Sequence, residues 1–71
     1  MTMTRPPQTT AALVRAAREA AGLTQAALAE RAHYGPPQIS QIERGVREPS
    51  LPVLRRLARV LRVEPGDLIG E

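Results

Sequence analysis

Apolar residues recur along the chain at spacings of three and four, which places them on one face of successive amphipathic helices. The spacing predicts four helices and a short fifth, over residues 9–21, 25–33, 36–44, 51–62 and 64–69. The inward faces carry the expected core residues: Val14, Ala17, Ala21, Leu28, Ala29, Ala32, Ile39, Ile42, Leu51, Leu54, Leu57, Ala58, Leu61 and Leu68. The pattern favours an all-α domain, a compact bundle of five short helices.

The expected helix ends carry residues suited to those positions. Thr24 and Ser50 precede the second and fourth helices, where a hydroxyl accepts a backbone N–H that the first turn leaves unpaired. Pro36 stands at the first position of the third helix, where its missing N–H has no partner to lose. Gly22 and Gly45 follow the first and third helices, where a left-handed backbone ends a helix. The run between these glycines therefore predicts two short helices joined by a tight turn.

Two short helices joined by a tight turn suit the helix-turn-helix motif, whose second helix enters the major groove of DNA. This chain resembles the phage-repressor/Cro-type, lambda-repressor-like helix-turn-helix domains from about Leu13 to Leu68. The residues that match the family pattern are Arg18, Gly22-Leu23-Thr24-Gln25, Leu28-Ala29, Ile39-Ser40-Gln41-Ile42-Glu43, Gly45, Pro49, Leu54, Leu57-Ala58, Leu61 and Val63. The resemblance implies a lambda-repressor-like bundle whose second and third helices form the motif.

The resemblance also implies which residues of the third helix face the bases: Pro36, Pro37, Ser40 and Gln41. The two prolines depart from the family, which usually has polar residues there. Proline has no side-chain donor or acceptor, so Pro36 and Pro37 are limited to contacts such as that with a thymine methyl group. Base recognition would then rest on Ser40 and Gln41. We expect modest sequence specificity, or specificity drawn partly from DNA shape.

Contacts to DNA phosphates are expected from five residues: Thr24, Gln25, Gln38, Arg44 and Arg47. Gln25 stands at a helix N-terminus, which favours phosphate through its free N–H groups and the helix dipole. Arg44 and Arg47 fall in the loop that crosses the sugar-phosphate backbone in this family. The alternative for Gln25 and for both arginines is an exposed polar side chain without a partner.

Arg18, taken alone, would be interpreted as a solvated charge on a helix surface. In the family, the matching arginine pairs with a glutamate at the end of the third helix, and Glu43 occupies that position. The resemblance therefore implies an Arg18–Glu43 ion pair, at least partly buried, that fixes the first helix against the third. Removing one partner of a buried pair strands the other charge, at a cost of about 3–5 kcal/mol.

Composition adds a basic balance and argues against several classes of function. The formal net charge is +3, and all ten basic residues are arginine, whose planar fork pairs with phosphate and guanine. A GC-rich genome would produce the same arginine bias. Cysteine is absent and His33 is the only histidine, so we expect no metal site and no cofactor. No pair of side chains suggests acid–base or nucleophilic catalysis, which argues against an enzyme.

We expect no small-molecule ligand, because 71 residues leave little room for a pocket beside a core. The sequence has neither an apolar run long enough to span a membrane nor the apolar segment of a signal peptide, so we expect a cytoplasmic protein. Residues 1–8 are predicted to form a flexible N-terminal arm, and residues 9–71 the helix-turn-helix domain.

The leading hypothesis is a sequence-specific transcriptional regulator that binds double-stranded DNA. It would bind a palindromic operator as a homodimer, with the helix over residues 36–44 in the major groove. Val60 and Ile69 are the candidate dimer contacts. The alternative is an antitoxin-type or other protein-interaction module on the same scaffold, with a toxin or RNA polymerase as its partner.

Overall fold

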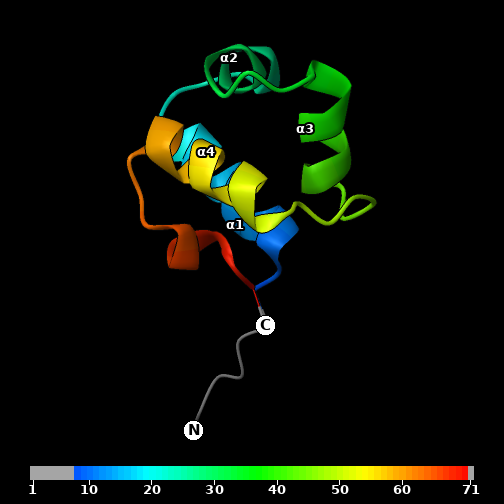
Figure 1. Cartoon of the computed structure of the whole chain (residues 1–71), viewed down its shortest axis with the longest axis vertical. Coiled ribbons are helices and arrows are strands. Elements are labelled where there is room, and N and C mark those ends of the chain that lie inside the picture. Colours follow the sequence, from blue (N-terminus) through cyan, green and yellow to red (C-terminus); the bar gives the residue numbers. More distant parts are fainter. Residues whose placement is uncertain (1–7, 71) are drawn as a thin grey trace, which may run out of the picture.

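The computed structural model describes residues 8–70, which fold as four α-helices and one 3-10 helix (Figure 1). The elements are α1 (Thr10–Ala20), α2 (Gln25–Arg31), α3 (Pro36–Glu43), α4 (Leu51–Leu61) and η1 (Pro65–Leu68). The all-α class is therefore confirmed, and the four long helices lie close to their predicted bounds. The fifth is a 3-10 turn rather than an α-helix, because Ile69 N–H closes back on the Gly66 carbonyl at 3.3 Å and ends it after one turn.

Apart from Gln8, the predicted N-terminal arm lies outside the described residues, as does Glu71. Within residues 8–70, no helix combines the length and the apolar character needed to cross a bilayer. The same part of the chain holds no group of three or more His, Cys, Asp or Glu side chains placed to bind a metal ion.

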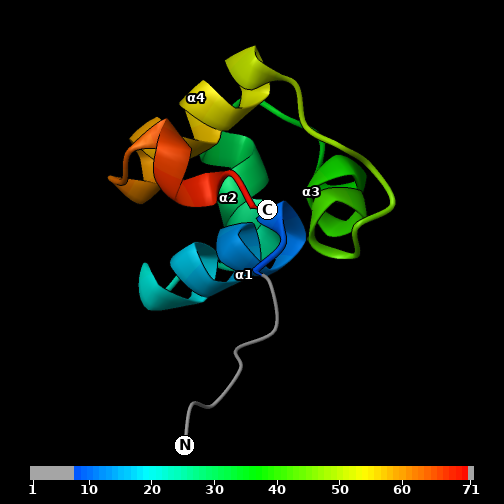
Figure 2. The ribbon, with the colours of Figure 1, turned by 90° about the horizontal axis from the view of Figure 1, so that it is seen from below.

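The helices enclose one apolar core. Figure 1 shows α4 in front of α1, with α2 at one end and α3 to one side, and Figure 2 shows α1 and α4 on opposite sides of the bundle. α3 contacts α1 and α2, while η1 contacts α1 and α4. The buried apolar residues are Val14, Leu28, Ala29, Ala32, Ile39, Ile42, Val53, Leu54, Leu57, Ala58, Leu61 and Leu68. Every α-helix thus contributes its apolar face to the same cluster.

Two residues predicted for the core lie outside it, in both cases because they stand at a helix end. Ala21 is the C-cap of α1 and is exposed, since the helix has already turned away from the core there. Leu51 is the first residue of α4 and is 47% exposed. Val53, which was not predicted as a core residue, is buried one half-turn further on. Ala17 faces the core but is only half-buried.

Hydroxyl side chains cap three of the four α-helices at their N-termini. Thr9, Thr24 and Ser50 each accept a backbone N–H from three residues further on, at 3.0–3.4 Å. This confirms the predicted caps at Thr24 and Ser50. α3 begins differently, because its N-cap is Gly35, and the Gln38 side-chain oxygen accepts the Gly35 N–H at 2.8 Å instead.

All four α-helices end in the same way. A residue with positive φ follows each helix: Gly22 (72°), His33 (54°), Gly45 (75°) and Arg62 (58°). The next residue donates its N–H to the carbonyl five residues earlier, as in a Schellman motif. Of these next residues, Leu23, Tyr34 and Val63 pack against the core. Val46, after α3, is 70% exposed.

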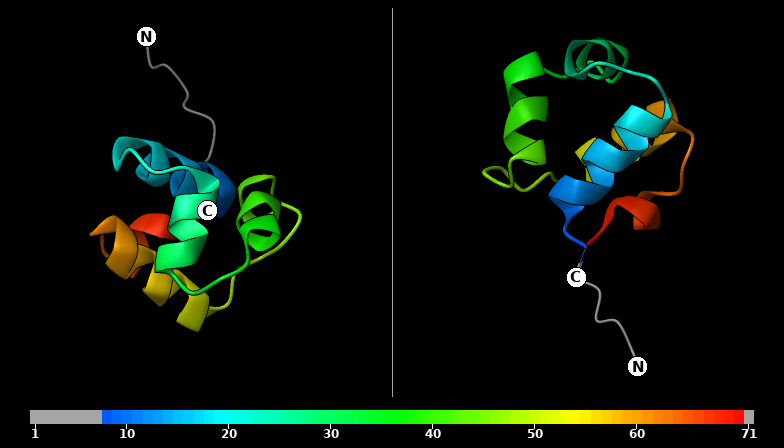
Figure 3. Two further views of the ribbon diagram at one scale, coloured as in Figure 1. Left: turned by 90° about the horizontal axis from the view of Figure 1, so that it is seen from above. Right: turned by 180° about the vertical axis from the view of Figure 1, so that it is seen from behind.

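The two ends of the described chain meet beside α1. Gly70 N–H donates to the Thr10 hydroxyl at 2.9 Å, and Figure 3 shows the start of α1 next to the last described residues. A Cβ on Gly70 would overlap the backbone of residues 8–10, so only glycine fits this approach.

A buried carboxylate joins three helices. Glu43, the last residue of α3, has a fully buried side chain. Arg18 of α1 contacts it with two nitrogens: Nε donates to Oε2 at 2.7 Å and Nη2 to Oε1 at 3.1 Å. Gln25 of α2 donates Nε2–H to Oε1 at 3.1 Å, and Arg15 lies 3.6 Å from the same oxygen. Arg18 also donates to the Leu23 carbonyl at 2.7 Å. We call the side chains of Glu43, Arg18, Gln25 and Arg15 the Glu43 network.

The network keeps Glu43 ionised. Burial by itself raises the pKa of the carboxyl, but the hydrogen bonds from Arg18 and Gln25 and the charges of Arg18 and Arg15 outweigh it. The pKa of Glu43 therefore lies below its ordinary value of 4.5. The hydrogen bond to Glu43 in turn raises the pKa of the Arg18 guanidinium.

Replacing Glu43 with glutamine removes the charge but keeps the shape of the side chain. We expect the free energy of unfolding at neutral pH to fall by about 3–5 kcal/mol, because Arg18 is then largely buried without its counter-charge. The stabilisation by Glu43 is complete above the unfolded pKa and is lost as pH falls through the lower folded pKa. The two proteins should therefore become more alike in acid, below the ordinary value of 4.5.

Urea unfolding across an acid-to-neutral pH series measures this difference. Glu30→Gln, at an exposed glutamate of α2, is the matched control and should change stability little. A stability gap between wild type and Glu43→Gln that stays constant down to the acid end would contradict the role given to the carboxylate.

Gly22→Ala should destabilise the domain by about 1 kcal/mol, because alanine must then adopt the left-handed conformation. No atom lies within 4 Å of the Cβ that would be added, so the cost comes from the backbone alone. Gly66→Ala is the matched control, since its Cβ also meets nothing within 4 Å and its φ is not positive. Thermal unfolding should show no loss for Gly66→Ala, or a slight gain; equal losses for both variants would refute this account.

Candidate nucleic-acid interface

α2 and α3 meet at a sharp corner, seen where the two labels stand at the top of Figure 1. The turn between them covers residues 32–35. His33 takes the left-handed conformation, and Tyr34 N–H donates to the Ala29 carbonyl at 2.8 Å. Tyr34 is half-buried against the core, and the Arg56 guanidinium lies 5.7 Å from its ring centre. Tyr34 thereby fixes the turn to α4. This contact helps to set the direction of α3 as it leaves the turn.

α3 has one buried face and one open face. Ile39, Ile42 and Glu43 are buried, so they hold the helix against α1 and α2. The predicted base-facing residues lie away from this face: Pro36 and Pro37 are exposed, and Ser40 and Gln41 are half-buried. Pairs four apart, Pro36 with Ser40 and Pro37 with Gln41, share one side of a helix. The structure therefore brings the four predicted residues onto one outer face of α3.

Both glutamines predicted to contact phosphate also have a partner within the protein. Gln25 is half-buried and donates to Glu43, which neither interpretation of the sequence anticipated. Gln38 uses its oxygen to accept the Gly35 N–H, which leaves its amide nitrogen free to donate. A glutamine three residues after an N-cap is the pattern of a capping box, so this bond was predictable. The Gln25 contact spans 18 residues and has no local sequence signal.

Thr24 is exposed, and its oxygen caps α2. Arg44 and Arg47 are both exposed in the loop over residues 44–50. Arg47 Nε donates to the Gln41 side-chain oxygen at 2.8 Å, a contact that the sequence did not suggest. The start of α2 and the loop after α3 thus carry exposed side chains that can donate hydrogen bonds.

The charges near α3 are mainly positive and unpaired. Across residues 8–70, the ion pairs involve Arg15 and Arg18, which both contact Glu43. The remaining described arginines are exposed: Arg31, Arg44, Arg47, Arg55, Arg56, Arg59 and Arg62. Of these, Arg44 and Arg47 directly follow α3.

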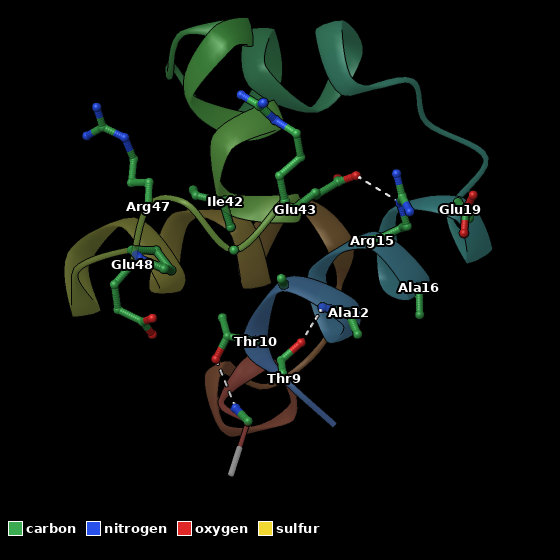
Figure 4. A pocket seen from close by; sticks show the side chains of 15 residues that line it. Thr9, Thr10, Ala12, Arg15, Ala16, Glu19, Ile42, Glu43, Arg47 and Glu48 are labelled. Atoms are coloured by element: carbon green, nitrogen blue, oxygen red, sulfur yellow. Dashed lines mark hydrogen bonds and ion pairs between the residues drawn. The ribbon is translucent and has the colours of Figure 1, made fainter. Parts of the chain in front are cut away.

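A broad groove of about 760 Å³ runs along α1, on one side, and along the end of α3 and the loop that follows it, on the other (Figure 4). Thr9, Thr10, Arg15 and Glu48 are among the residues that line it. Figure 4 shows the Arg47 side chain extending from the loop away from α1. The charged side chains around the groove are exposed apart from Glu43, which lies in its wall. The groove therefore borders both the Glu43 network and the loop.

The chain is similar to known helix-turn-helix proteins. The helix-turn-helix family model matches residues 14–68. An uncharacterised HTH-type transcriptional regulator of Mycobacterium tuberculosis is 46% identical over 50 residues, which are 70% of this chain and 36% of that protein. The chain therefore spans about a third of the length of the curated relatives it matches.

Two solved structures have the same fold. The restriction-modification controller protein C.AhdI from Aeromonas hydrophila is 33% identical, with a TM-score of 0.81 over 84% of this chain and 91% of that chain. The P22 c2 repressor, in a crystal structure with a synthetic operator, is 32% identical, with a TM-score of 0.82 over 87% of this chain and 94% of that one. Because the family model matches most of the chain, and the fold is that of the P22 c2 repressor, the chain belongs to the lambda-repressor-like helix-turn-helix family.

Proposed function

We propose that this domain binds double-stranded DNA in a sequence-specific manner, with α3 in the major groove. The observation that carries the proposal is the division of α3 into a face locked by Ile39, Ile42 and Glu43 and an open face followed by two unpaired arginines. A rigidly held helix with an open face, flanked by cations, suits insertion into a groove lined by phosphates. The similarity to the P22 c2 repressor, whose structure includes an operator, supports the same mode.

Base recognition is assigned to the outer face of α3. Pro36 and Pro37 present exposed apolar surface at the start of the helix, which suits a thymine methyl group. Ser40 and Gln41 supply the hydrogen bonds, and glutamine can pair with adenine through two of them. Because two of the four positions lack polar atoms, we expect a short consensus with sequence-dependent DNA shape contributing at other positions.

Phosphate contacts are assigned to residues at the rim of this face: Thr24, Gln25, Gln38, Arg44 and Arg47. The Gln38 amide nitrogen is free because its oxygen is occupied by Gly35. One of the two amide protons of Gln25 stays available after its bond to Glu43. The exposed arginines of the loop supply the positive charge.

We further propose that two copies bind a palindromic site, with half-sites about one helical turn apart. Ile69 is 53% exposed just after η1 and is the better candidate for the contact between copies. Val60 is half-buried and packs against the core, so less of it is available to a partner.

Selection of bound sequences from a random duplex pool, at near-physiological salt, tests the proposal. A palindromic consensus would support a dimer that recognises bases. Salt-sensitive binding without a consensus would refute sequence specificity and leave only phosphate contacts. No binding to any duplex would refute the proposal and favour the alternative of a protein-interaction module.

Gln41→Ala should relax the base preference at one position of each half-site. One bidentate contact is worth about 1–3 kcal/mol of discrimination against a wrong base, so competition with single-base variants should show the loss. The selected sequences should otherwise keep the wild-type pattern. An unchanged preference at every position would show that Gln41 does not recognise a base.

Arg44→Ala should weaken binding to all sequences by a similar factor and lower the slope of log affinity against log salt by about one. Arg59→Ala removes an equal charge from an exposed position in the last turn of α4, and it is the matched control. Fluorescence anisotropy over a salt series measures both slopes. If the two variants lower the slope equally, the loop arginine has no specific phosphate contact.

A further inference from the structure

The loop after α3 is held by a different kind of contact from the other helix exits. After α1, α2 and α4 an apolar or aromatic residue packs against the core, but after α3 the equivalent Val46 is 70% exposed. The loop instead folds back onto Gln41. The Gln41 carbonyl accepts the Val46 N–H at 2.9 Å, as at the other helix ends, and in addition the Arg47 N–H at 3.2 Å. The Gln41 side-chain oxygen accepts Arg47 Nε–H at 2.8 Å.

Arg47 therefore contacts Gln41 with both its backbone and its side chain. Arginine has donors only, so the side-chain atom of Gln41 that faces it must be the oxygen. Rotation of the Gln41 amide by half a turn would place its NH₂ group against Nε–H, donor against donor. The contact thus selects one orientation of the amide, with the oxygen toward the loop and Nε2 free. The Nη1 and Nη2 groups of Arg47 make no hydrogen bond among the described residues and stay available.

We propose that Arg47 is a positioning residue for base recognition, which fixes the Gln41 amide so that it offers its Nε2 donor to a base edge. The inference rests on the proposed DNA-binding function. A donor presented in the major groove suits a purine, whose N7 accepts, and the second lone pair of the Gln41 oxygen still suits the N6 donor of adenine. Cytosine offers a donor at this edge and would be disfavoured.

The proposal gives Arg47 a dual role that a phosphate contact alone does not have. The Nη groups carry the positive charge toward the sugar-phosphate backbone, while Nε holds the side chain that recognises the base. Arg44 provides the comparison, because it is an exposed arginine at the other end of the same turn and makes no side-chain hydrogen bond among the described residues. Loss of either arginine removes one charge, but only loss of Arg47 frees the Gln41 amide.

The experiment compares selected sequences and single-base competition for five proteins: wild type, Arg47→Ala, Arg44→Ala, Gln41→Ala and Gln41→Ala/Arg47→Ala. Arg47→Ala should lose affinity for all duplexes and, in addition, lose about threefold to tenfold of the discrimination at the base pair assigned to Gln41. Arg44→Ala should lose affinity to a similar extent and keep that discrimination. The double variant should bind DNA more weakly than Gln41→Ala alone and should have the same base preference as Gln41→Ala. Circular dichroism confirms that each variant is folded.

Two outcomes would overturn the inference, and they differ. If Arg47→Ala selects the wild-type sequence with lower affinity, Arg47 is a phosphate contact only, and the proposed DNA-binding function stands. If the wild type itself selects no sequence, Gln41 recognises no base, and both the proposed function and the role of Arg47 fall.

Discussion

Glu43 ends α3 with a carboxylate that water does not reach, and side chains from two other helices must meet it before α3 can pack. An unpaired buried charge costs several kcal/mol, so any arrangement that displaces α1 or α2 leaves the carboxylate stranded. Packed apolar residues of similar volume often replace a buried ion pair with no loss of stability. The main role of the Glu43 network is thus to fix the position of α3 relative to α1 and α2. This position sets the direction in which the open face of α3 points.

Local rules predicted most of the fold. The spacing of apolar residues located the four α-helices, and the capping residues Thr24 and Ser50 located their starts. The errors at Ala21 and Leu51 arose at helix ends, where a periodic pattern continues although the chain has turned away from the core. The Arg18–Glu43 pair was implied by family resemblance, because no local pattern links residues 25 positions apart.

The candidate site was less predictable, because its details depend on side chains that meet through space. Family resemblance supplied the four residues assigned to the outer face of α3, and their spacing of four places them on one side of the helix. The sequence did not supply the second role of Gln25, or the bond from Arg47 to Gln41, since neither has a local signature. Val46 shows why: an apolar residue at this place after a helix is normally a core residue, and only the folded structure reveals that the loop is anchored elsewhere.

The bond between Gly70 and Thr10 brings the two ends of the described chain together, at the end of the molecule opposite the α2–α3 corner (Figures 1 and 3). Polypeptide joined to the described residues at either end would therefore start from the same region, which lies away from Pro36 and Pro37. The scaffold is therefore suited to fusion at both termini, and to circular permutation through a short linker, with the start of α3 left uncovered. Because the Gly70 backbone lies in contact with residues 8–10, such a linker would need glycine at that point.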